Sequence, residues 1–409
     1  MPRARTDDAQ SVPAPTPRPQ PSSERLTSLD GLRGLAALVV LVHHVVLAAV
    51  PALAAVHLSG AHAALPGWAQ VAVHTPLHLL WAGEEFVLVF FALSGLVLTM
   101  PAVRGTAPSL ARYYPHRLLR LYGPVWLAIA FAAIVRSAVP HETVAGASWW
   151  LNAHAEPMSA WQVGHDGTLV FGTGGFAATS VLWSLRWEVL FSLLLPVFVW
   201  VGQRTRGMPW AVAAVAFAVL AASGGHDSPR YMPAFLLGSL MAFEIDRIRA
   251  LGARLGRLAK AALVVGCVCA MTAGWWLQPE AWLAPGPALD VAHGALRALT
   301  TAGACLAVAL PLTVGSLRRA LDTPAMQWVG SRSFSLYLVH EPIVVTAALA
   351  LGGRASVVAV AAVAVPLALL AAEGFFRVAE RPLHRLSRRV GVLSESVLRG
   401  GGRESSQPA

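Results

Sequence analysis

Charged side chains are scarce in this chain of 409 residues, at 13% of the total, about half the share in an ordinary soluble domain. Lysine is nearly absent, since Lys260 stands alone among 31 basic residues. Hydrophobic residues make up 56%, and the mean hydropathy is +0.58. A soluble globule of this size would lack the polar surface to cover such a core. The composition therefore excludes a water-soluble protein and indicates a chain that folds in lipid.

Cysteine is also rare, and all three residues, Cys267, Cys269 and Cys305, lie inside apolar runs. Their number is odd and their spacing is not that of metal ligands, so a disulfide framework and a structural zinc site are excluded and no metal is expected. The formal net charge of +10 would suit a nucleic-acid partner. Nucleic acid is excluded because the arginines occur in short clusters between long apolar runs, the pattern of a polytopic membrane protein.

Apolar stretches long enough to cross a hydrocarbon core of about 30 Å recur along the chain. The sequence predicts an all-α membrane protein, a polytopic bundle of about ten transmembrane helices. The predicted spans are residues 32–50, 77–99, 118–139, 182–201, 208–222, 231–245, 260–278, 295–315, 334–351 and 355–376.

Basic residues should gather on the cytoplasmic side of alternate loops. With the N-terminus placed inside, nearly all arginines fall on that side. The exceptions are Arg136, Arg230, Arg297 and Arg354, which fall outside, and Arg186, which lies within a span. Both termini are therefore predicted to be cytoplasmic, in a multi-pass protein of the cell membrane.

Three regions follow from this pattern. Residues 1–25 are polar and rich in proline, so we expect a disordered cytoplasmic tail. Residues 26–390 form one transmembrane domain, and residues 391–409 are expected to be a second disordered cytoplasmic tail. Outside loops 51–76 and 140–181 are the longest connections. They either form an extracytoplasmic acceptor pocket or anchor their aromatic residues at the membrane interface.

Ionisable residues inside a span are costly and mark functional sites. In the first span, Arg33 and His44 lie on one face of one helix, about 16 Å apart in rise. In the fourth span, Glu188 lies at nearly the same depth as His44, with Ser184 one turn away on the same face. A carboxylate beside an imidazole raises its basicity, as general-base catalysis requires. The alternative is a structural hydrogen bond that joins two helices.

Six sequence blocks together resemble the membrane-bound acyltransferase 3 family, in the family's order. They are LDGLRGLAALVVLVHH, FFALSG, RLLRLYGPVW, WSLRWEVLFSLLLP, SFSLYLVHEP and ERP, which cover residues 26–385. The resemblance implies an integral membrane O-acyltransferase that takes an acyl group, often acetyl, from cytoplasmic acyl-coenzyme A. The acceptor would be a hydroxyl of a sugar, a polysaccharide or a secondary metabolite. Two departures from the family pattern are evident. Leu88 stands where the family often has an acidic residue, two positions before Phe90 and Phe91. We also expect no hydrolase domain of the kind that some relatives append.

Carried over by position, the family's catalytic motif falls on Arg33 and His44, its RxxR motif on Arg117 and Arg120, and its glutamate on Glu188. We expect His44, supported by Glu188, to act as general base, either in direct transfer or with a transient acyl group on the imidazole. Arg33 would steer acyl-coenzyme A, whose phosphates would lie near Arg117 and Arg120. His340 is a candidate for the donor channel, and candidates for acceptor contact are Trp183, Ser184, Glu84 and Glu85. No permanently bound cofactor is expected.

A secondary transporter or flippase would also have about ten spans and a few buried ionisable residues. Transporters often show inverted repeats or broken spans in corresponding halves, and neither is evident in the sequence. This class remains the alternative to the acyltransferase.

Overall fold

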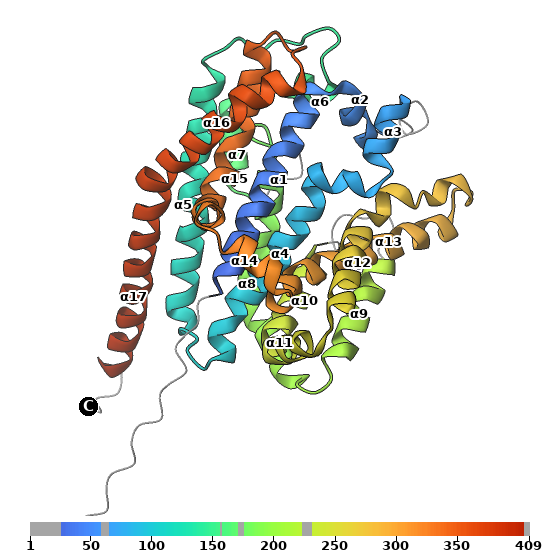
Figure 1. Cartoon of the computed structure of the whole chain (residues 1–409). Coiled ribbons are helices and arrows are strands. Elements are labelled where there is room, and N and C mark those ends of the chain that lie inside the picture. Colours follow the sequence, from blue (N-terminus) through green and yellow to red (C-terminus); the bar gives the residue numbers. More distant parts are fainter. Residues whose placement is uncertain (1–25, 59–64, 156–157, 171–175, 223–230, 405–409) are drawn as a thin grey trace, which may run out of the picture.

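The computed structural model describes residues 26–58, 65–155, 158–170, 176–222 and 231–404. Within these ranges the chain is helical and contains no strand (Figure 1). Eight of the described helices are long and apolar enough to cross a membrane. A helix satisfies its backbone hydrogen bonds internally, as a chain in hydrocarbon must. The prediction of an all-α, polytopic membrane protein is confirmed.

The long helices correspond to eight of the predicted spans. They are α1 (Thr27–Ala49), α4 (Gly83–Val103), α5 (Leu110–Arg136), α8 (Leu182–Arg204), α12 (Arg257–Trp276), α13 (Pro287–Thr313), α15 (Pro324–Ala350) and α16 (Val357–Phe375). The fifth and sixth predicted spans are the shorter apolar helices α9 (Pro209–Ala222) and α10 (Met232–Phe243). Helices α5, α13 and α15 begin several residues before the predicted spans, because each starts with a more polar turn that the apolar pattern does not include.

Helices α15 and α1 form the centre of the bundle. In the most apolar window of each, 83% and 67% of the residues are buried, compared with 22% in α12. The outer helices expose leucine, valine and tryptophan side chains, as helices that meet lipid do. An ionisable side chain on α1 or α15 must therefore find its partners within the protein.

Glycines set the register between the two central helices. A Cβ at Gly34 would lie 2.7 Å from the Gly330 nitrogen, and a Cβ at Gly330 would lie 2.2 Å from the Asp30 oxygen. Only glycine permits this approach, and small residues allow membrane helices to pack closely. The two helices run in the same direction from the contact between Gly34 and Gly330. His44 and His340, ten residues farther along α1 and α15, therefore lie side by side.

The connection between α5 and α8 folds over the end of α1. It contains the short helices α6 (Trp149–Ala153) and α7 (Ala160–Asp166), although residues 156–157 and 171–175 lie outside the described residues. Trp149 Nε1 donates to the Ala54 oxygen at 2.6 Å, and Ser148 Oγ donates to the Ala48 oxygen at 3.3 Å. These contacts attach the connection to α1, and polar residues of the connection reach the central helices.

The chain end differs from the prediction. Helix α16 continues through a π-helical turn, Phe376–Glu380, into α17 (Arg381–Glu404), which packs along the first half of α5 (Figure 1). The His116 and His384 rings lie 6.0 Å apart between these helices. The expectation of disorder from residue 391 is therefore wrong as far as Glu404, because α5 supplies a packing surface that composition does not reveal. The predicted tail 1–25 lies outside the described residues.

Candidate active site

His44 lies in the last third of α1, with 8% of its surface exposed. Its Nδ1 is 3.0 Å from the Val40 oxygen and 2.9 Å from His340 Nε2. His340 Nδ1 donates to the Leu336 oxygen at 2.9 Å, which leaves His340 Nε2 as an acceptor. This hydrogen-bond pattern assigns the proton of a neutral His44 to Nδ1, so Nε2 carries the lone pair.

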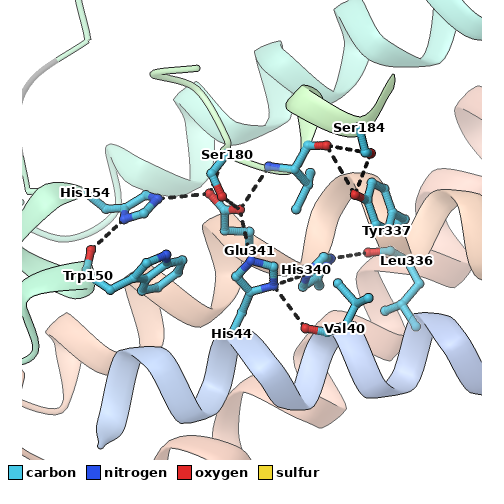
Figure 2. A network of polar contacts seen from close by, with 11 residues as sticks. Val40, His44, Trp150, His154, Ser180, Ser184, Leu336, Tyr337, His340 and Glu341 are labelled. Atoms are coloured by element: carbon cyan, nitrogen blue, oxygen red, sulfur yellow. Dashed lines mark hydrogen bonds and ion pairs between the residues drawn. The ribbon is translucent and has the colours of Figure 1, made fainter. Parts of the chain in front are cut away.

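Glu341 is the carboxylate that faces His44 Nε2, at 3.6 Å (Figure 2). It lies on α15 and is 1% exposed. The Ser180 nitrogen and Oγ each donate to it at 2.6 Å, and the Val181 nitrogen donates at 3.2 Å. His154 Nε2 makes a further contact at 3.1 Å. Several donors therefore hold a buried anion beside the imidazole, which stabilises a positive charge there.

His154, at the end of α6, makes a closer contact with Glu341 than His44 does, at 3.1 Å. Its Nδ1 donates to the Trp150 oxygen at 2.7 Å, while its Nε2 points to the carboxylate (Figure 2). Burial lowers the pKa of His154, but the hydrogen bond and charge of Glu341 outweigh this effect and raise the pKa above its usual 6.5. Glu341 therefore favours the protonated form of His154, which would compensate the buried carboxylate.

Glu188 is not the carboxylate beside His44, and that prediction was wrong. It accepts a hydrogen bond from Arg117 at 2.6 Å, and Arg117 Nε donates to Ser192 Oγ at 3.0 Å. The prediction pairs His44 with Glu188 because both lie at a similar depth in the membrane. Depth does not determine which neighbouring helix a side chain faces. Glu341 satisfies the same depth criterion on α15.

A cavity of about 110 Å³, here called the arginine cavity, brings together three of the four predicted donor residues. It is lined by Arg33, Arg117, Arg120, Ser184, Glu188 and Tyr337, among others. Arg117 is occupied by Glu188, whereas neither Arg33 nor Arg120 has a hydrogen bond or close ion pair with a residue that the structure describes. Two guanidinium groups thus face the cavity, and guanidinium groups suit phosphate.

His340 does not belong to the arginine cavity, which corrects its expected place in the donor channel. The predicted span began at residue 334, so His340 was placed near the cytoplasmic edge. Helix α15 begins at Pro324, which moves His340 to the middle of the bundle, in contact with His44. Its hydrogen bonds make it a support for the His44 ring.

Ser184 and Tyr337 stand between the arginine cavity and His44. Ser184 Oγ and Tyr337 OH are 2.7 Å apart, and Tyr337 OH also donates to the Val181 oxygen at 3.3 Å (Figure 2). Both residues line the arginine cavity, and Tyr337 also lines a second one. This histidine cavity, of about 200 Å³, is lined by His43, His44, His57, Glu84, Trp150 and Trp183, among others.

Four cavities follow one another through the bundle. A lower cavity of about 300 Å³, near the start of α1 and the end of α4, contains Asp30 and Arg104 and shares Arg33 with the arginine cavity. The arginine and histidine cavities share Val87 and Tyr337. The histidine cavity shares His57 and Glu84 with a wide cavity of about 910 Å³. His44 thus lies between two approaches from opposite directions.

Two of the four residues expected to contact the acceptor line the wide cavity. Glu84 and Glu85, in the first turn of α4, both line it. Glu85 is buried and accepts a hydrogen bond from Trp275 Nε1 at 2.6 Å, whereas Glu84 is exposed to the cavity space. Trp183 lines the histidine cavity and Ser184 the arginine cavity, so the four expected acceptor residues are distributed over three cavities.

Comparisons with known proteins identify the family of this chain. A family model described as an acyltransferase domain matches residues 26–373. The chain is 26% identical over 399 residues to Acyltransferase MdmB of Streptomyces mycarofaciens, an alignment that covers 90% of this chain and 93% of that protein. No solved structure matches.

Proposed function

The chain belongs to the acyltransferase 3 family, and from that premise we propose that it moves an acyl group from acyl-coenzyme A to a hydroxyl group, with His44 as the general base. The acyl group is acetyl or a similarly short chain. The acceptor is a sugar, a polysaccharide or a glycosylated secondary metabolite. The donor approaches through the lower and arginine cavities, and the acceptor approaches through the wide cavity.

The single observation that carries the proposal is the environment of His44. Its Nδ1 proton is engaged on one side of the ring, and Nε2 faces Glu341 at 3.6 Å on the other. An imidazole in this state can accept a proton at Nε2, and the carboxylate then stabilises the imidazolium. A carboxylate that stabilises the imidazolium assists general-base catalysis. The cavities on both sides of His44 support the proposal that two substrates meet there.

The chemical step balances with these groups. His44 Nε2 takes the hydroxyl proton as the hydroxyl oxygen bonds to the thioester carbonyl carbon. The carbon–sulfur bond then breaks, and the thiolate of coenzyme A takes the proton back from the imidazolium. Glu341 remains a carboxylate throughout and acts as a positioning residue for His44, while Ser180 and His154 hold it in place.

The donor would present its phosphates to Arg33 and Arg120, because these guanidinium groups have no close ion pair with a described residue. Arg117 supports this arrangement through Glu188 and Ser192. From Arg33 to His44 the helix rises about 16 Å. An extended pantetheine arm passing Ser184 and Tyr337 would deliver the thioester to the histidine cavity.

The test is acyl transfer in membranes that contain the full-length protein. Radiolabelled acetyl-coenzyme A is supplied with extracts of cells that lack the protein, and products are identified by a mass increase of one acyl unit. We expect His44→Ala to abolish labelling while its amount in the membrane stays the same. His141→Ala, which removes an imidazole from the connection after α5, should retain activity.

Labelling that survives in His44→Ala would contradict the role of His44. Solute flux through reconstituted protein without any acyl donor, together with no acyl transfer, would instead support a transporter. Accumulation of a labelled protein adduct that disappears in His44→Ala would establish a transient acyl-imidazole in place of direct transfer.

A further inference from the structure

The wide cavity has features that indicate the chemical class of the acceptor. Its volume of about 910 Å³ lies near the upper end of the range for small-molecule sites, about 300–1,000 Å³. It meets the histidine cavity at Glu84 and His57. A molecule that fills it could therefore extend one hydroxyl past this junction toward His44.

The walls of the wide cavity carry an excess of negative charge. Three carboxylates line it, and among its described lining residues Arg297 is the single arginine. Glu85 accepts from Trp275, and Glu280 pairs with His293 at 2.5 Å. Glu84 differs from these two, because it has no hydrogen bond or close ion pair with a residue in the described part of the chain.

His57 does not supply the missing counter-charge. It lies in the 3-10 turn Ala55–His57 and lines the same junction as Glu84. Burial lowers the pKa of His57, and the opposing effect of the Glu84 charge does not reverse this. His57 therefore offers Glu84 little positive charge near neutral pH. Glu84 lies where the wide cavity meets the histidine cavity.

Aromatic side chains line the same two cavities as this carboxylate. Trp275 and Tyr231 line the wide cavity together with Glu84, and Trp183 lines the adjoining histidine cavity with its ring centroid 5.0 Å from that of Tyr231. One face of Trp275 is stacked on His78 at 4.2 Å. A carboxylate with aromatic rings around it is the usual environment for an ammonium group in proteins.

We propose, on the basis of the proposed acyl transfer, that the acceptor is a cationic molecule whose ammonium group binds Glu84 in the cavity that Trp275 and Tyr231 also line, while its hydroxyl reaches His44. An amino sugar or another hydroxylated amine has this chemistry. A neutral polyol would leave Glu84 without a partner when it displaced water, which is unfavourable for a desolvated carboxylate.

Choline and 3,3-dimethylbutan-1-ol test this proposal, because they have the same shape and both carry a hydroxyl, but only choline is charged. Dissociation constants are measured on the purified full-length protein by calorimetry. We expect choline to bind about tenfold more tightly than the neutral alcohol. Glu84→Gln should bring the two affinities together, and Glu84→Asp should preserve the difference. Glu142→Gln, which removes a carboxylate from outside the cavity, should leave the ratio unchanged.

Equal affinities in the wild-type protein, or a choline preference that persists in Glu84→Gln, would overturn the proposal. If Glu84→Gln does not fold, Tyr231→Leu provides the second test, because loss of one aromatic wall should reduce the choline preference but leave binding of the neutral alcohol intact. Acyl transfer to cellular acceptors is measured in parallel. Transfer without a cation preference would reject this inference alone, whereas absence of His44-dependent transfer would reject the proposed function.

Discussion

The two approaches to His44 carry opposite charge. The lower and arginine cavities are lined by more basic than acidic groups: Arg33, Arg104, Arg117 and Arg120, compared with Asp30 and Glu188. The wide cavity has three glutamates and one arginine. Electrostatic complementarity steers a charged ligand toward its own site and away from the wrong one. An anionic donor and a cationic acceptor would each be directed to one end of the route and meet only at the imidazole.

Two glutamates near His44 differ in how many hydrogen-bond donors surround them. Glu341 is buried and receives hydrogen bonds from Ser180 and Val181. Glu84 faces cavity space and has no such donors among the described residues. A carboxylate held by its own protein supports another side chain, whereas one that is left open is available to a ligand. Removing each charge should therefore have different kinetic consequences.

The largest effect is expected from Glu341→Gln. The amide cannot stabilise the imidazolium of His44, so kcat should fall by about 10²- to 10⁴-fold, the range for loss of acid–base assistance. KM for acyl-coenzyme A should change little, because Glu341 does not line the arginine cavity. Glu188→Gln is the matched control, and its main effect should be on the donor KM. A greater loss of kcat in Glu188→Gln than in Glu341→Gln would contradict this account and favour Glu188 as the partner of His44.

An intermediate effect is expected from Arg33→Ala. Loss of a charge-assisted contact with phosphate costs about 1.5–3 kcal/mol, which corresponds to a donor KM raised by about 10- to 100-fold. Steady-state kinetics should show no comparable change in the acceptor KM. Arg257→Ala, at the exposed start of α12, serves as the control. If both KM values changed equally, the separation of donor and acceptor approaches would be wrong.

The smallest effect concerns the pH dependence of stability. The pKa of His154 is raised in the folded protein, so its ion pair with Glu341 contributes fully below pH 6.5 and is lost as the pH rises through the raised value. At pH 6, His154→Gln should lower Tm by about 2–4 °C. The difference in Tm between His154→Gln and the wild-type protein should become smaller in alkaline buffer. A difference that widens with pH would show that His154 is neutral when paired.

The sequence was sufficient for most of the architecture, and the family resemblance carried by its six blocks is confirmed. Apolar runs identify the spans because lipid admits few other sequences. The cost of an ionisable side chain in lipid singled out Arg33 and His44 in the first span, and the family resemblance singled out Arg117 and Arg120. These arginines share one cavity in the structure, while their roles remain a proposal.

The partners of His44 were harder to predict. Glu341 is an ionisable residue in a span, adjacent to His340, and that signal was present in the sequence. Depth alone favoured Glu188, since no sequence pattern gives the rotation of one helix against another. His154 and Ser180 come from a connection between spans, where apolar periodicity carries no information. The glycine contacts between α1 and α15, visible only in the structure, set the register that brings His340 beside His44.

Sidedness of the reaction tests the opposed approaches most directly. The purified protein is reconstituted into sealed vesicles, its orientation is established by protease removal of an epitope tag added at the C-terminus, and acetyl-coenzyme A is supplied on one face only. We expect free coenzyme A to appear on the face that carries the start of α1, and acylated acceptor to form only when the acceptor is present on the opposite face. Formation of product with both substrates confined to one face would contradict the central claim.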